Sequence, residues 1–281
     1  MSKKITLGKC ILLSLLTGIL LFGLAACAEK ETPPEEKAQN ETIVQTHPEE
    51  ETAAESDEKE GVYEGDRKNG LRDGQGKMIY PDGGIYEGQF VNDLREGLGK
   101  MIYADGRVYE GQWKADKKEG QGKFTWPDGD VYEGQFANSV REGLGKMTDA
   151  DGRVYEGQWK ADKKEGQGKF TWPNGDVYEG QFTNGVREGL GKMTYADGRV
   201  YEGQWKADKG EGQGKMIYAN GRIYEGQYKD GEKEGQGKFT WPNGDVYEGQ
   251  FTNGVREGQG KMTYANGEVK EGLWKQDKFE G

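Results

Sequence analysis

Apolar and polar residues alternate in short runs along most of the chain, and the same order of runs returns every 23 residues. The clearest copy begins at Tyr155 and ends at Val177. A fixed period this short is typical of a repeat array, in which each unit packs against its neighbours. We number the positions of a unit 1 to 23 from its opening residue. The nine full units open at Tyr63, Tyr86, Tyr109, Tyr132, Tyr155, Tyr178, Tyr201, Tyr224 and Tyr247, and a truncated tenth opens at Lys270.

Each unit predicts two β-strands and two turns. Positions 23 to 5 and positions 13 to 18 are short runs of β-branched and aromatic residues with a period of two. Turn sequences separate them: Asn-Gly or Ala-Asp-Lys-Lys on one side, Pro-Asn-Gly or Ala-Asp-Gly on the other. This is the pattern of successive β-hairpins. A helix is excluded because every unit carries at least four glycines and keeps no apolar residue at helical spacing.

The alternation assigns the residues to two faces of the predicted sheet. Positions 1, 3, 5, 12, 14, 16 and 18 form an aromatic face, and Val, Glu, Gln, Lys and Thr form a polar face. All 15 tyrosines and all seven tryptophans lie at positions 1, 5, 16 or 18. The glycines at positions 3, 12 and 14 are expected to leave hollows on the aromatic face, over which neighbouring rings lie.

The aromatic face has two interpretations. It is either the core of a one-sheet protein or a binding groove for a peptide, a glycan or a lipid. The candidate residues for both interpretations are Tyr109, Trp113, Phe124, Trp126, Tyr155, Trp159, Phe170, Trp172, Tyr201 and Trp205.

Several motifs of the unit resemble the MORN (membrane occupation and recognition nexus) repeat. They are Tyr-Glu-Gly-x-aromatic at 178–182, Asn-Gly at 184–185, Gly-x-Gly at 189–191 and Asp-Gly at 197–198. The resemblance covers residues 62–281 and implies an elongated, all-β fold: a single antiparallel sheet of tandem hairpins. For function, it implies scaffolding, protein contacts or membrane association rather than one activity.

Units occur in two versions. The version at 109, 155 and 201 contains Gln-Trp-Lys-Ala-Asp-Lys, and the version at 86, 132, 178 and 247 contains Gln-Phe. Residues 109–154 and 155–200 differ at four places only, which indicates a duplicated pair of units. One difference is Asp149, which stands at position 18, where the other full units have Tyr or Trp.

Residues 1–26 are predicted to be a secretion signal. Lys3, Lys4 and Lys9 precede an apolar stretch that is too short for a comfortable membrane span. The following Leu-Ala-Ala-Cys, which ends at Cys27, resembles the lipobox of bacterial lipoproteins. That resemblance implies cleavage before Cys27, acylation including palmitate, and a lipid anchor in the cell envelope. The alternatives are an uncleaved anchor or an ordinary signal with a chance cysteine.

Residues 27–61 are predicted to be the acylated cysteine followed by an acidic, disordered tether. Residues 28–60 contain twelve acidic residues against three lysines and have no aromatic residue. The absence of Asp after Cys27 favours an outer membrane, if the envelope has one. The array at 62–281 is nearly balanced in charge, which argues against a nucleic-acid surface.

The composition indicates a protein without a metal site or cofactor. Cys10 lies in the predicted signal and Cys27 is predicted to be acylated, so no disulfide or cysteine-based metal site is expected. His47 lies in the tether without partners. Asp128-Gly129-Asp130 lacks the ligand ladder of a calcium loop and is interpreted as a turn.

No enzymatic activity is expected, because the glutamates of the array recur in every unit rather than converging at one place. The sequence therefore predicts a membrane-anchored, non-enzymatic scaffold for an unidentified protein partner. The alternative is a glycan or cell-wall binder that uses the aromatic face.

Overall fold

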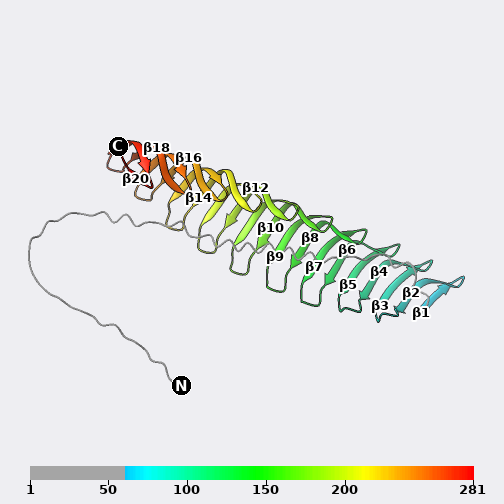
Figure 1. Ribbon diagram of the computed structural model, residues 1–281. Coiled ribbons are helices and arrows are strands. Elements are labelled where there is room, and N and C mark those ends of the chain that lie inside the picture. The colour runs from blue at the N-terminus through cyan, green and yellow to red at the C-terminus, as the bar shows by residue number, and fades with distance from the viewer. Residues whose placement is uncertain (1–60) are drawn as a thin grey trace, which may run out of the picture. The chain divides into compact units, whose positions relative to one another are not determined.

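The computed structural model describes residues 61–281, and these form one open antiparallel β-sheet (Figure 1). The predicted signal, Cys27 and the tether up to residue 60 lie outside the described residues. Each of the twenty strands pairs with the next strand in chain order, so successive hairpins are added along one direction. The described part of the chain contains no helix that could cross a membrane. The predicted elongated sheet of tandem hairpins is confirmed.

The strands alternate between seven and nine residues, apart from the last. In order they are β1 Val62–Lys68, β2 Leu71–Ile79, β3 Ile85–Val91, β4 Leu94–Ile102, β5 Val108–Lys114, β6 Lys117–Thr125, β7 Val131–Ala137, β8 Val140–Thr148, β9 Val154–Lys160, β10 Lys163–Thr171, β11 Val177–Thr183, β12 Val186–Thr194, β13 Val200–Lys206, β14 Lys209–Ile217, β15 Ile223–Lys229, β16 Glu232–Thr240, β17 Val246–Thr252, β18 Val255–Thr263, β19 Val269–Lys275 and β20 Lys278–Phe279.

The second strand of each unit begins earlier than the sequence pattern predicts. In the Tyr155 unit it begins at Lys163, position 9, because the turn needs only Ala161 and Asp162. Both turn residues have positive φ, of 45° and 64°. Two consecutive residues of this kind match the twist of a hairpin, as in type I′ turns. The two lysines that were predicted to belong to the turn are therefore strand residues.

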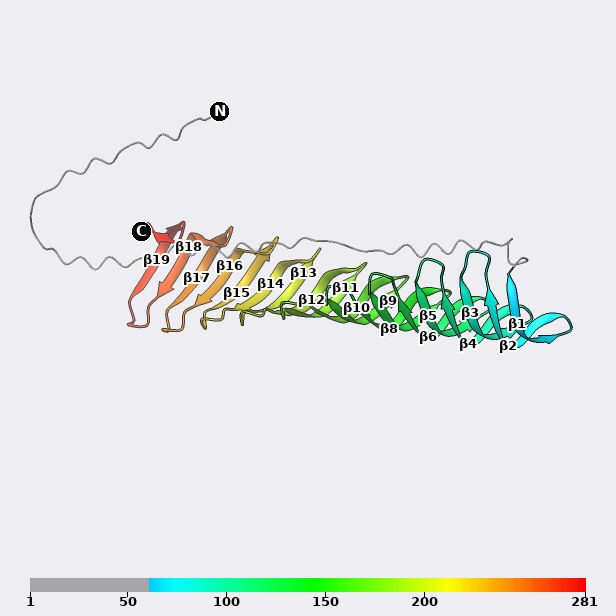
Figure 2. The same cartoon turned by 90° about the horizontal axis from the view of Figure 1, so that it is seen from below.

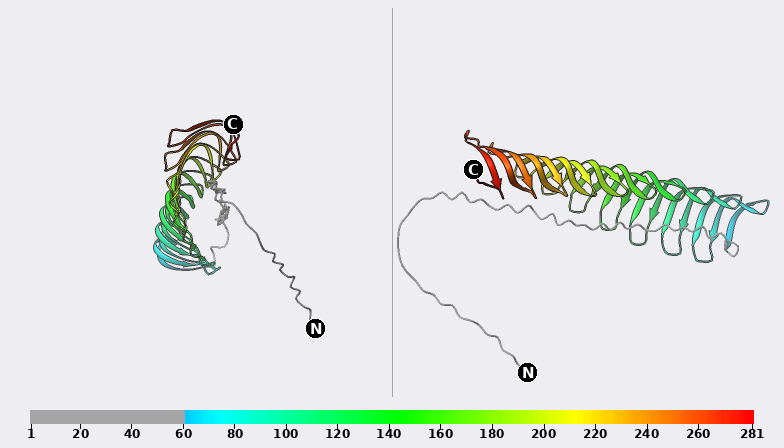
Figure 3. Two further views of the ribbon diagram at one scale, coloured as in Figure 1. Left: turned by 90° about the vertical axis from the view of Figure 1, so that its left-hand side faces the viewer. Right: turned by 45° about the horizontal axis from the view of Figure 1, so that its top comes forward.

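Each hairpin bends toward its aromatic face. Within β6, the Nζ atom of Lys118 lies 4.6 Å from the ring centroid of Phe124. A straight strand advances roughly 20 Å over six residues, which these two side chains could not bridge. The strand therefore curves. Figure 2 and the left view of Figure 3 show this curvature along the array.

The bend coincides with a bulge in the second strand. Between Glu165 and Gly168 the register with β9 shifts, so Gly166 and Gln167 have no partner on that strand. Gly166 has φ of +62°, which favours glycine. The side-chain Oε1 atom of Gln158 accepts the N–H of Gln167 at 2.9 Å. Gln158, at position 4, thus accepts the N–H of Gln167, which has no partner residue on the β9 backbone.

Candidate functional site

The residues predicted for the aromatic face are mostly enclosed by the bent sheet. Nine of the ten are buried, with Tyr109 and Phe124 fully inaccessible. The tenth, Trp172, is half-buried and packs against the same core. These side chains are joined into one core that extends through all units from Met78 to Trp274.

The opening tyrosine of each unit lies over the glycines at positions 3 and 14. The Tyr155 hydroxyl donates to the carbonyl oxygen of Gln158 at 2.8 Å, which holds the ring along the sheet. A Cβ atom on Gly157 would stand 2.6 Å from that hydroxyl. The predicted hollows at positions 3 and 14 are therefore occupied by rings. At position 12 the prediction was wrong, because Gly166 is the bulge residue and faces the Gln158 side chain.

The rings of neighbouring units form a continuous ladder. The Tyr155 ring is 5.2 Å from Trp159 in its own unit and 5.1 Å from Phe182 in the next, both edge-to-face. The same two contacts recur from unit to unit, up to the pair Tyr247–Trp274. Edge-to-face pairs at this distance add roughly 0.5–1.5 kcal/mol each beyond the area they bury. The ladder therefore couples the stability of each unit to that of its neighbours.

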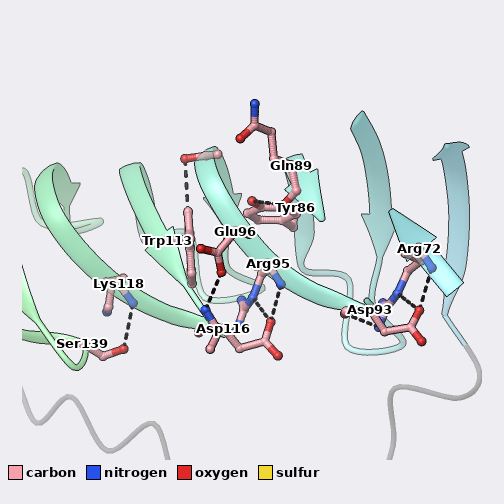
Figure 4. A network of polar contacts seen from close by, with 12 residues as sticks. Arg72, Tyr86, Gln89, Asp93, Arg95, Glu96, Trp113, Asp116, Lys118 and Ser139 are labelled. Atoms are coloured by element: carbon pink, nitrogen blue, oxygen red, sulfur yellow. Dashed lines mark hydrogen bonds and ion pairs between the residues drawn. The ribbon is translucent and has the colours of Figure 1, made fainter. Parts of the chain in front are cut away.

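A cation at position 10 covers the ladder, which was not expected from the sequence. Eight of the nine full units carry Arg or Lys there. The Arg95 guanidinium carbon lies 4.3 Å from the Trp113 ring centroid, and Arg95 Nε is 3.0 Å from Asp116 Oδ1 (Figure 4). Position 10 has the same parity as positions 14 and 16, so its place on the aromatic face could have been deduced. The charge of the side chain argued against that assignment.

Acidic residues of the turns join consecutive units. Besides the ion pair with Arg95, Asp116 Oδ1 accepts the backbone N–H of Arg95 at 2.8 Å. Glu96, at position 11, accepts the N–H of Ala115 in the next turn at 2.9 Å (Figure 4). The recurring glutamates at position 11 thus accept hydrogen bonds from the backbone of the next turn.

Burial changes the pKa of several core groups. It raises the pKa of Tyr178 and of Tyr247 to about 12. It lowers the pKa of Lys164 and of Lys233, both at position 10, to about 8. Removing charged groups from water disfavours their ionised forms, which accounts for both directions.

Asp149 replaces an aromatic ring at position 18 and is half-buried. Its Oδ2 atom lies 3.0 Å from Arg153 Nε. Burial raises the pKa of the Asp149 carboxyl, whereas the charge of Arg153 acts in the opposite direction. The carboxylate is thus retained in the core region by an ion pair.

The polar face carries rows of ion pairs between units. Lys146 Nζ lies 3.0 Å from Glu156 Oε1, and the equivalent pair Lys169–Glu179 is at 3.3 Å. Three leucines interrupt this polar surface at position 13, where the other six full units have Gln. Leu98, Leu144 and Leu190 are 66%, 63% and 64% exposed, respectively.

Shallow grooves cross the polar face along the backbone of the glycines at positions 3 and 14. One is floored by Gly88 and Gly99 and bordered by Leu98, Lys100 and Glu110. A similar groove runs over the units near Gly226. Within residues 61–281, no group of three or more His, Cys, Asp or Glu side chains could hold a metal ion.

Comparisons with known proteins support the repeat assignment. A family model described as the MORN repeat matches nine consecutive segments. They are residues 63–85, 86–106, 109–131, 132–152, 155–177, 178–198, 201–221, 224–246 and 247–269. No curated protein matches the chain.

Similarity to solved structures is low. The wild-type TCP10 domain of CPAP from Danio rerio is 11% identical, with a TM-score of 0.41 over 72% of this chain and 94% of that one. The TCP domain of SAS-4 from Drosophila melanogaster is 12% identical, with a TM-score of 0.28 over 71% and 90%. Virginiamycin B lyase from Staphylococcus aureus is 12% identical, with a TM-score of 0.16 over 77% and 89%. None of these likenesses carries an argument about function.

Proposed function

This chain belongs to the MORN repeat family, and we propose that it is a non-enzymatic scaffold whose polar face binds a protein partner. Its nine tandem MORN repeats are the kind of array that serves as a repeat-based binding scaffold. We assign binding to the polar face because of its row of leucines at 98, 144 and 190. Each is nearly two-thirds exposed on a face whose other residues are Lys, Glu, Gln, Thr, Val and Ile, and each is more exposed than the isoleucines of that face, such as Ile102 at 38%.

The spacing of these leucines suits a long partner. They recur every 46 residues, which is four strands. At about 4.8 Å between strands, consecutive leucines are roughly 19 Å apart along the array. Apolar anchors within a polar, hydrogen-bonding rim are typical of protein interfaces. The groove beside Leu98 adds a concave surface next to one anchor.

The aromatic face is less suited to binding. A glycan stacks on accessible rings, but Tyr109, Trp113 and the equivalent residues are buried beneath one another and beneath the cations at position 10. A glycan would have to displace these groups. The half-buried rings at position 18, such as Trp172 and Trp241, are the part of the aromatic face from which a glycan could gain contacts.

We also propose that Cys27 anchors the array to a membrane of a bacterial envelope through attached lipid. This anchor requires cleavage before Cys27 and acylation of its thiol at the Leu-Ala-Ala-Cys motif. A lipid chain supplies about 0.8 kcal/mol per buried CH₂, so several chains on one cysteine make a stable anchor. The proposal excludes catalysis. It is supported by the absence of His and Cys from residues 62–281 and by the turn role of the recurring glutamates.

The binding face is tested by replacing each leucine with the residue that the other units already carry at the same position. The variant with Leu98→Gln, Leu144→Gln and Leu190→Gln places at position 13 the residue found there in the other units, so folding is preserved. Wild-type and triple-variant arrays serve as baits for envelope extract, beside sedimentation with peptidoglycan. Loss of a specific protein by the triple variant supports the proposal. Equal capture by both baits would refute the polar face, and sedimentation of both arrays with peptidoglycan would favour the glycan alternative.

The anchor is tested separately with Cys27→Ser in the full chain. Acyl labelling should be lost, and the protein should move from the membrane fraction to the soluble fraction. Persistent acyl labelling of this variant would refute the anchor and leave the binding proposal intact.

A further inference from the structure

The glutamines at position 4 form a row of fixed amide groups along the polar face. In the unit at 132, the Oε1 atom of Gln135 accepts the backbone N–H of Leu144 at 2.8 Å. Gln158 makes the same bond to Gln167 in the next unit, at 2.9 Å. Both glutamine side chains are exposed, and within residues 61–281 no group accepts a hydrogen bond from their Nε2 atoms. This glutamine row therefore offers fixed N–H donors in successive units.

A row of ion pairs runs beside the glutamine row. It consists of Glu at position 2 and Lys at position 15, such as Glu156 and Lys146, whose Oε1 and Nζ atoms are 3.0 Å apart. Positions 2 and 4 lie two residues apart on one strand, so the two rows are roughly 7 Å apart. The groove between them follows glycine backbone from Gly65 in β1 to Gly111 in β5 and passes Leu98. Because the charges beside it are paired, the groove suits an uncharged occupant.

The width and the period of the polar face exclude an α-helix as this occupant. A helix with its side chains is about 10–12 Å across, which exceeds the distance between the two rows. Consecutive leucines of the three are roughly 19 Å apart. A helix advances about 13 residues over this distance, and residues with that separation lie on nearly opposite sides of it. A helix therefore cannot face all three leucines.

The period also distinguishes between extended conformations. A β-strand advances roughly three residues over the 9.6 Å of one unit, so successive glutamines would meet its opposite faces. A polyproline II helix has three residues per turn and a rise of about 3.1 Å, so one turn covers about 9.3 Å. It presents the same side to every unit, and over the four units from Leu98 to Leu190 the mismatch grows to only about 1 Å.

The hydrogen-bonding groups of polyproline II also fit the glutamine row. This conformation has no internal hydrogen bonds, so its carbonyl oxygens need donors from outside. Successive glutamines are one turn of the helix apart, and their amides therefore meet every third carbonyl. The three leucines are two turns apart, so apolar contact with them falls on every sixth residue.

We propose that the polar face binds a proline-rich segment of a partner protein in the polyproline II conformation. Every third carbonyl of the segment accepts an N–H from the glutamine row, and every sixth residue packs against Leu98, Leu144 or Leu190. Proline favours this conformation because its ring fixes φ near −65°. The assignment of this occupant rests on the proposed scaffold function, since the segment binds through the same leucines.

The probe is a fluorescently labelled oligoproline of twelve residues, and its control is a labelled Gly-Ser peptide of equal length. Oligoproline extends about 37 Å, which matches the roughly 38 Å from Leu98 to Leu190. It carries carbonyl acceptors but no backbone N–H donor between its prolines. Binding to the full chain is measured by fluorescence anisotropy, and we expect oligoproline to bind more tightly than the flexible Gly-Ser peptide.

Two variants test the contacts separately. The triple leucine variant should bind oligoproline at least roughly tenfold more weakly. Gln135→Glu combined with Gln158→Glu keeps an acceptor for the backbone N–H but removes the amide donors, which should weaken binding roughly tenfold. The matched control is Gln227→Glu combined with Gln250→Glu, which makes the same change in units without a leucine at position 13. This control should bind oligoproline as the wild type does.

Three results would overturn this occupant. The wild type binds oligoproline no more tightly than the Gly-Ser peptide, the triple leucine variant binds it as tightly as the wild type, or the two glutamate variants bind it equally. Capture of a partner from extract tests the scaffold function itself. Leucine-dependent capture without binding of oligoproline would refute the polyproline II segment and leave the scaffold function standing.

Discussion

The ring of Tyr155 lies so close to Gly168 that a Cβ atom on this glycine would stand 2.5 Å from ring carbon Cε2. Gly168 pairs with Gly157 on one neighbouring strand and with Gly180 on the other. This pairing continues through the array, so a column of glycines crosses the sheet beneath the tyrosines. The close approach explains why position 14 has no side chain in any unit.

Gly168→Ala is therefore expected to destabilise the array. A methyl group must displace the Tyr155 ring or the backbone, and overpacking of this kind costs about 1–3 kcal/mol. The measurement is the urea midpoint of the full chain. Lys169→Ala is the matched control, because its exposed side chain lies on the opposite face and should change stability by less than about 0.5 kcal/mol. Equal effects of the two variants would contradict the role of the glycine column.

Asp149→Tyr is expected to stabilise the array. In related units, Arg107 and Arg199 lie 4.9 Å and 4.4 Å from the ring of the tyrosine at position 18. The new tyrosine would give Arg153 the same partner and would remove a half-buried carboxylate. A gain of about 1 kcal/mol is expected from the aromatic contacts. A lower thermal midpoint than that of the wild type would show that the ion pair with Arg153 contributes more than the ring.

The stability of the array should rise between pH 7.5 and about 9.5. The pKa of Lys164 is about 8 in the fold but about 10.4 in an unfolded chain. Between these values the unfolded state binds more protons, so increasing pH favours the folded state. Because Lys164 is only partly buried, solvent reduces the effect to on the order of 1 kcal/mol. Urea midpoints at the two pH values measure the rise, and Lys164→Met should diminish it.

Above about pH 10 the trend should reverse. The pKa of Tyr178 is raised to about 12, so unfolded tyrosines lose their protons before the buried ones do. The unfolded state is then favoured by increasing pH. A continued rise up to pH 11 would mean that the tyrosines ionise freely within the folded array.

Deleting residues 155–200 should leave a folded but shorter array. This deletion removes two whole units and joins Val154 to Tyr201, which restores the sequence at the junction. Small-angle scattering should show a shortening of roughly 19 Å, from four strands at about 4.8 Å. Deleting 155–165 instead removes most of β9 and places β10 out of register. Circular dichroism should then show loss of sheet, and equal folding of both deletions would contradict the hairpin register.

Regular features of the fold could be predicted from the sequence, because the 23-residue period repeats the same evidence in every unit. The two strands of each unit and the aromatic face follow from alternation, and the turns follow from their Gly, Asn and Asp residues, but the second strand begins four residues earlier than the pattern predicts. The bulge at Gly166 and the acceptor role of Gln158 could not be predicted, because they depend on the register between strands. The place of Arg95 on the aromatic face follows from the parity of position 10, but only the structure shows the ring and the carboxylate that offset the burial of its charge.

The strands of this sheet run across the array, so their backbone hydrogen bonds point along its length. A force applied between the two ends would load these bonds one after another, as in unzipping, rather than many at once. Each unit that opens releases 23 residues and lengthens the chain by roughly 70 Å. Single-molecule pulling should show a series of small, evenly spaced steps, and one abrupt rupture would contradict this geometry. A scaffold built in this way unfolds unit by unit under tension, and the units that remain folded keep their polar face intact.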